Sequence, residues 1–140
     1  MTESRDRTLD ALLDDIAERF DVASSAVVVP DGRSGALGIA ASVGLDDAAA
    51  AGLTAAIARP GHPIARTFEE RVATFDVQPI NPGGPALRSH IPLVVSRDGD
   101  ESVVGVLALA HDRPIEPAAR ANLLETARVA ADAIDQNETD

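Results

Sequence analysis

The segment 84–110 constrains the fold of this chain more than any other stretch. It holds two apolar runs, ALRSHIPLVV and SVVGVLALA, separated by the polar stretch RDGDE. Apolar runs of this length joined by an Asp-Gly turn predict two β-strands paired as an antiparallel hairpin. Both runs are apolar at nearly every position, so other parts of the chain must cover both faces of the sheet. We therefore expect this hairpin at the centre of a sheet.

The residues before the hairpin predict further helices and strands. One face of a first helix of about four turns carries its apolar side chains, namely Leu9, Leu12, Leu13, Ile16 and Phe20. Two strands follow, SAVVVP and ALGIAASVGL, joined by the turn PDGRSG. The stretch DDAAAAGLTAAIA is a predicted helix that is expected to lie flat against the sheet. His62 and Pro63 start a second helical piece, PIARTFEER, and VATFDV is a predicted short strand.

After the hairpin, a last helix is predicted from about Pro117 to Asp135. Strands and helices occur in groups instead of alternating, which predicts an α+β fold with an antiparallel sheet. The terminal helices are expected to share one face of that sheet, and segment 46–85 should cover the other. A length of 140 residues suits one domain over 1–140, with a core from about 8 to 135 and frayed termini.

The composition excludes several classes of function. The net charge is −11 and every basic residue other than histidine is Arg, so neither nucleic acid nor an anionic membrane is an expected partner. No apolar run approaches the ~18 residues of a membrane span, and the polar N-terminal stretch does not resemble a secretory signal. We therefore expect a cytoplasmic, acidic protein. The chain has no Cys, which excludes disulfides, thiolate metal sites, cysteine nucleophiles and thioether-linked chromophores.

Five stretches in order resemble a GAF domain over nearly the whole chain. They are LDALLDDIAERF, SSAVVVP, GHPIARTFEERVATFDV, LRSHIPLVV and VVGVLALAHDRPIEPAARANLLETARVAADAI. The resemblance implies a GAF-like fold, which is related to PAS and profilin-like folds. Its central antiparallel sheet would have five to six strands, with the N- and C-terminal helices on one face. Short helices and loops would form a pocket on the other face.

Members of the GAF family bind small molecules, carry chromophores or haem, or dimerise within signalling proteins. A few free-standing members reduce methionine sulfoxide through cysteines, and most bilin-binding members also attach the bilin to cysteine, which is absent here. The signature of cyclic-nucleotide binding, which includes Lys, is absent too. In haem-binding relatives the ligand precedes the strand that LRSHIPLVV resembles, where this chain has NPGG. No cofactor is identifiable, haem and bilin are disfavoured, and we expect no enzyme.

Two polar residues interrupt the first strand of the hairpin. Arg88 and His90 are two positions apart and therefore share one face of that strand, whereas Ser89 and Ile91 share the other. Polar groups in so apolar a strand need partners. Structural pairing is one interpretation. The other is that both residues hold an anionic or polar ligand, because the guanidinium fork of Arg matches carboxylates.

A pocket is predicted between the sheet and segment 62–85. The candidate ligand-binding residues are Arg88, His90, His62, Phe68, Phe75, Ile80 and Asn81. His62 at a helix start and His111 at a strand end also have simple structural explanations. No three or four side chains converge in a pattern that predicts a metal site, and the acidic residues around Asp98 suit a hairpin turn.

Two functional hypotheses follow from these observations. The first is a sensory or regulatory GAF domain that binds a small molecule noncovalently in this pocket and acts on a signalling protein. The alternative is a dimerisation or protein-interaction module without a ligand. Its homodimer would form through the terminal helices, where small residues would permit close packing: Ala127, Ala130, Ala131 and Ala133.

Overall fold

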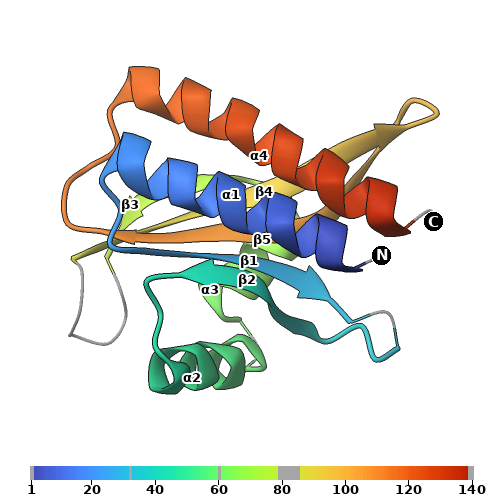
Figure 1. The fold of residues 1–140 in the computed structure, drawn as a ribbon, viewed down its shortest axis with the longest axis horizontal. Helices are drawn as coiled ribbons and strands as arrows, with labels where there is room; N and C mark the ends of the chain where they lie inside the picture. Colours follow the sequence, from blue (N-terminus) through green and yellow to red (C-terminus); the bar gives the residue numbers. More distant parts are fainter. Residues whose placement is uncertain (1, 32, 60, 79–85, 139–140) are drawn as a thin grey trace.

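The computed structural model describes residues 2–31, 33–59, 61–78 and 86–138 (Figure 1). Within these ranges the elements follow the predicted order: α1 (Thr2–Phe20), β1 (Ser24–Pro30), β2 (Leu37–Val43), α2 (Asp47–Ile57), α3 (Pro63–Glu70), β3 (Thr74–Val77), β4 (Leu87–Arg97), β5 (Asp100–His111) and α4 (Pro117–Glu138). None of the helices in the described ranges has the length and apolarity that a membrane span requires.

The strands form one five-stranded sheet in the order β2-β1-β5-β4-β3, with every neighbouring pair antiparallel. β4 and β5 pair along their whole length, as the two apolar runs predict. Their connecting residues, Asp98 and Gly99, both have positive φ angles, 52° and 86°, which suits a tight hairpin turn. Gly105 lets β5 approach β1 closely, because a Cβ there would lie 2.5 Å from the carbonyl oxygen of Val28.

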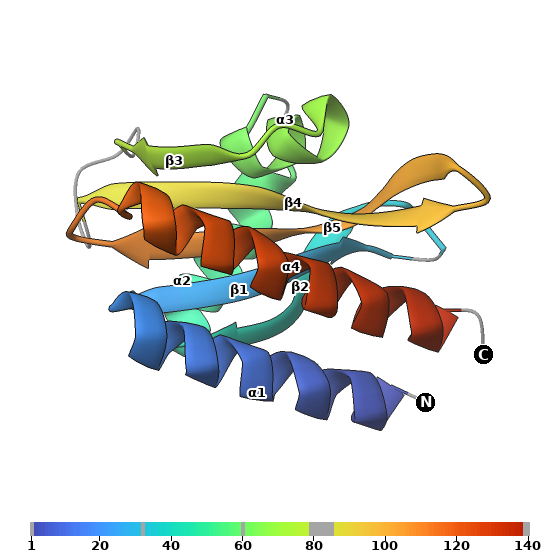
Figure 2. The ribbon, with the colours of Figure 1, turned by 90° about the horizontal axis from the view of Figure 1, so that it is seen from above.

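Helices α1 and α4 cover one face of the sheet, and α2 and α3 lie on the other (Figures 1 and 2). This arrangement confirms the predicted assignment of the terminal helices to one face. The core under α1 and α4 includes Leu9, Leu13, Ile16, Ile91, Leu93, Leu107, Leu109, Leu123, Ala127, Ala131 and Ile134. A smaller core under α2 and α3 comprises Val28, Ile57, Ile64, Val106 and Ala108. Helix α2 buries only Ile57 and packs Leu53 beside it, so it contributes little to this core.

Both edge strands carry one extra residue relative to their partners. On β2, Ala40 is the extra residue, since Val27 pairs with Ala41 and Val28 with Ile39. On β3, residues 75 and 76 stand opposite a single residue of β4. Such β-bulges bend the strand and change the direction in which its side chains point. The bulge of β3 determines which face of the sheet its side chains reach.

Candidate functional site

The two polar residues of β4 lie on the α3 face of the sheet. Ile91 and Leu93 pack in the core under α1 and α4, so the alternating residues Arg88 and His90 point the other way. His90 is only 5% exposed. Its Nδ1 lies 3.5 Å from Oγ1 of Thr74 on β3, which is long for a hydrogen bond. Arg88 is half-buried and donates from one guanidinium nitrogen to the carbonyl oxygen of Leu87.

His62 joins this group from the start of α3. It is the N-cap residue of that helix, and its Nδ1 accepts a hydrogen bond of 3.1 Å from the backbone N–H of Ile64. The proton of the neutral ring is therefore on Nε2. Pro63 at the beginning of the helix explains why the chain turns into a helix here. The sequence prediction that His62 lies at a helix start is confirmed.

Burial and nearby positive charge lower the pKa values of the two histidines on this face. Burial, followed by the nearby positive charge of Arg59, lowers the pKa of His62. Burial, followed by the charges of His62 and Arg88, lowers the pKa of His90 from 6.5 to about 4. Because burial is the larger cause for both histidines, their rings are held in the neutral form, and Arg88 supplies the positive charge of the group. We call His62, Arg88 and His90 the basic cluster.

The predicted pocket walls do not all lie beside the basic cluster. Phe68 packs against the small core on the α3 face, as expected. Phe75 lies on the opposite face, where it packs against the larger core and the guanidinium of Arg120 lies 4.8 Å from its ring centroid. Phe75 therefore cannot line a pocket with Phe68, because it directly follows Thr74 in the strand and points to the opposite face. Ile80 and Asn81 lie outside the described residues.

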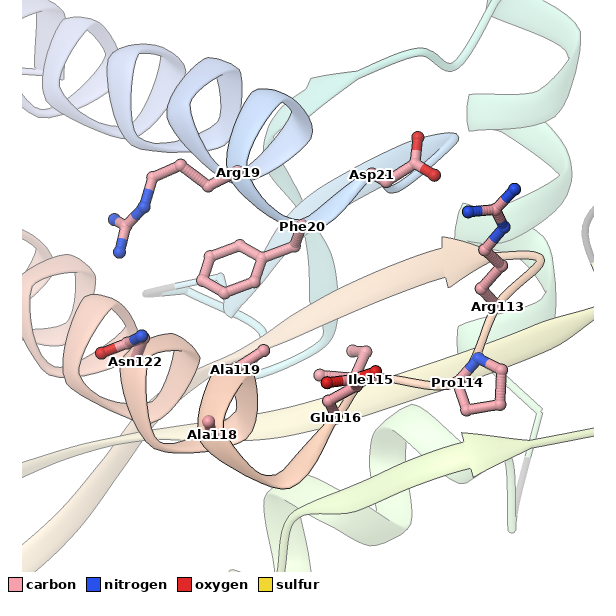
Figure 3. A pocket seen from close by; sticks show the side chains of 10 residues that line it. All are labelled: Arg19, Phe20, Asp21, Arg113, Pro114, Ile115, Glu116, Ala118, Ala119 and Asn122. Atoms are coloured by element: carbon pink, nitrogen blue, oxygen red, sulfur yellow. The ribbon is translucent and has the colours of Figure 1, made fainter.

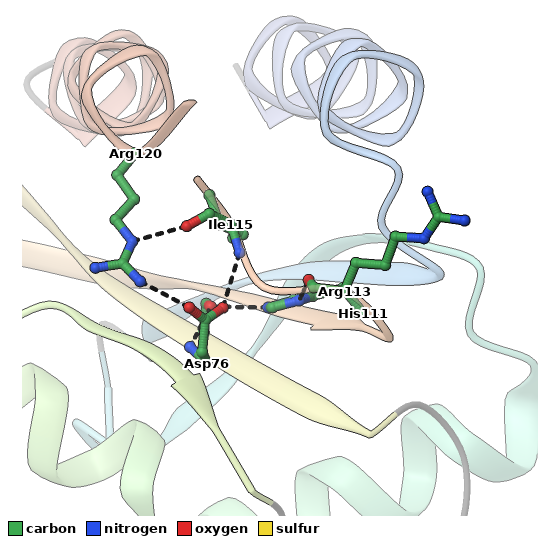
Figure 4. Close-up of polar contacts among 6 residues, drawn as sticks. Asp76, His111, Arg113, Ile115 and Arg120 are labelled. Atoms are coloured by element: carbon green, nitrogen blue, oxygen red, sulfur yellow. Dashed lines mark hydrogen bonds and ion pairs between the residues drawn. The ribbon is translucent and has the colours of Figure 1, made fainter. Parts of the chain in front are cut away.

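The same bulge turns the side chain of Asp76 toward α4 (Figure 4). Asp76 has a φ of 57°, which lies in the left-handed region. Its carboxylate accepts hydrogen bonds of 2.9 Å from the backbone N–H of Ile115 and 2.7 Å from the guanidinium of Arg120. Nε of Arg120 donates in turn to the carbonyl oxygen of Ile115. We call these contacts, which join β3 to the beginning of α4, the Asp76 bridge.

A buried serine–histidine pair extends the bridge across β4 and β5. The backbone N–H of Asp76 donates to Oγ of Ser89, and this Oγ lies 2.8 Å from Nε2 of His111. Nδ1 of His111 lies 2.7 Å from the carbonyl oxygen of Arg113. Because a carbonyl only accepts, Nδ1 carries the proton and Nε2 accepts from the Ser89 hydroxyl.

This pair has the atoms of a nucleophile and a base, but it is inaccessible. Ser89 and His111 are 0% and 1% exposed, so no substrate can reach the hydroxyl. The pair therefore has a structural role, as predicted for His111 at the end of its strand. Sequence reasoning missed both the pair and the Asp76 bridge. The one available signal was an Asp inside a short strand, where this residue type is depleted.

The structure also shows a cleft of about 460 Å³ on the α1–α4 face (Figure 3). It lies between the end of α1 and the beginning of α4, and its lining includes Arg19, Phe20, Asp21, Arg113 and Glu116. Two arginines and two carboxylates balance its charge, and none of the predicted site residues lines it. Among the described residues, no group of three or more His, Asp or Glu side chains is placed to hold a metal ion.

Solved structures with the same architecture cover nearly the whole chain. The GAF domain of a phosphoenolpyruvate-protein phosphotransferase from Coxiella burnetii matches with a TM-score of 0.77 at 14% identity, over 97% of this chain and 85% of that one. The second GAF domain of DevS from Mycobacterium smegmatis matches with a TM-score of 0.73 at 19% identity, over 95% and 94%. This chain has the GAF domain fold.

The GAF fold by itself does not distinguish binding from catalysis. A type II free methionine-R-sulfoxide reductase from Thermoplasma acidophilum shares the fold with a TM-score of 0.71 at 12% identity, over 96% of this chain and 95% of that one. No protein-family model matches the sequence, and no curated protein matches it. The function of this chain therefore depends on its own residues and not on its fold.

Proposed function

We propose that this GAF domain is a sensory or regulatory module that binds a small anionic molecule noncovalently at the basic cluster. The observation that carries the proposal is the gathering of His62, Arg88 and His90 on one face of a chain whose net charge is −11. Packing of an apolar core does not by itself require three basic side chains at one place. A carboxylate or phosphate group on the ligand would pair with the guanidinium of Arg88 and accept hydrogen bonds from imidazole N–H groups.

The surroundings of the basic cluster suit a ligand with an apolar body. Phe68 is half-buried on the same face, where it packs against the smaller core. Apolar enclosure with a few placed polar groups is the usual form of a small-molecule site. The negative charge of a ligand would raise the pKa of His90 again, so binding is expected to be accompanied by proton uptake.

We expect binding without covalent catalysis at this site. The chain contains no Cys, so the chemistry of cysteine-dependent reductases has no nucleophile here. The Ser89–His111 pair is buried on the opposite face of β4. A cytoplasmic location, a signalling protein as partner, and the lack of nucleic-acid and membrane partners remain predictions.

Thermal shift and calorimetric titration with small carboxylates and phosphates test the proposal. We expect at least one of them to stabilise the wild type, and this stabilisation to be lost in Arg88→Gln. The matched control is Arg128→Gln, which removes the same charge from an exposed position of α4 and should respond like the wild type. Equal responses in all three proteins would contradict a site at the basic cluster.

A second candidate function is protein interaction through the terminal helices. Leu124 and Val129 of α4 are 40% and 50% exposed, which favours a contact on the outer surface of this helix. The small residues predicted to mediate such a contact do not lie there, because Ala127, Ala130 and Ala131 are buried in the fold. We expect sedimentation analysis to show a homodimer that Leu124→Glu dissociates. A monomeric wild type would contradict this candidate.

A further inference from the structure

Strand β3 reaches both faces of the sheet within three residues. Its first residue, Thr74, pairs with His90 and places its hydroxyl next to the imidazole on the α3 face. Two residues later, Asp76 binds Ile115 and Arg120 on the α4 face. In a regular strand, residues 74 and 76 would point to the same face. The bulge removes that alternation and connects the basic cluster to α4 by a very short stretch of backbone.

The conformation of Asp76 is explained by its partners and not by a turn alone. A left-handed backbone costs free energy in every residue except glycine, and such strain persists where surrounding contacts specify it. Asp98 has nearly the same φ, 52°, in the exposed hairpin turn, but in the described ranges no bond links its side chain to another element. At position 76, glycine would fit the backbone but could not bind Arg120.

We propose that the Asp76 bridge couples the two faces of the sheet, so that a displacement of β3 at the basic cluster changes how the first turn of α4 is held. The bridge contains the bonds that this requires, since one carboxylate holds both the backbone of Ile115 and the guanidinium of Arg120. As regulation by a ligand, the coupling rests on the proposed function. The coupling itself can be measured without any ligand.

Amide hydrogen exchange in two variants tests the coupling. Asp76→Asn keeps an acceptor for the N–H of Ile115 and tolerates the left-handed backbone, but it removes the ion pair. Arg120→Gln removes the same ion pair from the α4 side. We expect exchange in α3 to become about fivefold faster in either variant, which is the effect of losing one partly exposed charged pair. The double variant should be no faster than either single one.

The matched control is Asp98→Asn, which makes the same chemical change in the same backbone conformation away from α4. It should leave exchange in α3 and α4 unchanged. If Arg120→Gln accelerates exchange only in 113–120 and 74–77, the bridge is a local brace and the coupling is refuted. A uniform acceleration that includes β1 and β5 would show general loss of stability and would also count against it.

These outcomes are separate from those of the binding experiment. Failure of every anion to bind would refute the proposed function, whereas a response of α3 to Arg120→Gln would still support the coupling. Conversely, an anion that binds at the basic cluster without any effect of Arg120→Gln on α3 would leave the site intact and refute the coupling.

Discussion

Replacing His90 with Gln is expected to protect the domain against acid. Burial, with the charges of His62 at the start of α3 and Arg88 on β4, lowers the pKa of His90 to about 4 from 6.5. The facing residue of β3, Thr74, is uncharged. The unfolded chain therefore takes up a proton at His90 before the folded chain does. Stability due to a neutral His90 is complete above pH 6.5 and is lost as the pH falls toward 4.

The size of this effect follows from the two pKa values. A shift of the pKa from 6.5 to about 4 lowers the unfolding free energy by about 3 kcal/mol once the pH is below 4. About 2 kcal/mol of this loss has already occurred at pH 5. The acidic residues titrate in both proteins, so the difference between wild type and His90→Gln isolates this group. Urea unfolding followed by far-UV circular dichroism suits a chain that has three Phe but no Trp or Tyr.

As the pH falls, the difference in unfolding free energy between the wild type and His90→Gln should shift in favour of the variant. Between pH 7 and pH 5, the wild type should lose about 2 kcal/mol more than His90→Gln. A difference that stays constant over this range would refute the buried, positively surrounded environment of His90. Saturation with a bound anion should reduce the loss, since the anion offsets the repulsion that lowers the pKa.

Three further substitutions test close packing and a buried hydrogen bond. Gly105→Ala should lower the unfolding free energy by about 1–3 kcal/mol, because its Cβ would press on the carbonyl oxygen of Val28. Gly52→Ala in α2, where the Cβ would meet nothing within 4 Å, should instead stabilise by about 0.5–1 kcal/mol. Equal effects of the two changes in urea unfolding would contradict this explanation. Ser89→Ala should cost about 1–3 kcal/mol because it leaves Nε2 of His111 without its buried donor, and a cost near zero would show that the pair is dispensable.

The order of the elements was predictable because it depends on local patterns. Apolar periodicity identifies α1 and the paired strands, and Asp98 and Gly99 identify the turn between β4 and β5. The seating of α2 was not predictable in this way. Its helix is rich in Ala and lacks a clear apolar stripe, so the sequence does not specify which side is buried, and only Ile57 is.

The candidate site was predictable only where adjacent residues determine it. The two-residue period of a strand places Arg88 and His90 on one face, and Pro63 explains the capping role of His62. The orientation of Asp76 could not be predicted, because one extra residue in β3 interrupts the alternation. That residue is held by Arg120, which is far away in the chain. A contact of this kind is specified by the tertiary structure and leaves no local pattern.

The irregular edge strands have a consequence for how this protein associates with itself. A straight, uncharged edge invites another strand to continue the sheet, and this is a common route to aggregation. Here the extra residue in β2 and the one in β3 interrupt the bonding pattern at both edges. An added strand could form only a short, broken ladder. Copies of the domain should therefore remain separate at their sheet edges even when concentrated, and a specific assembly would have to use the helical layer.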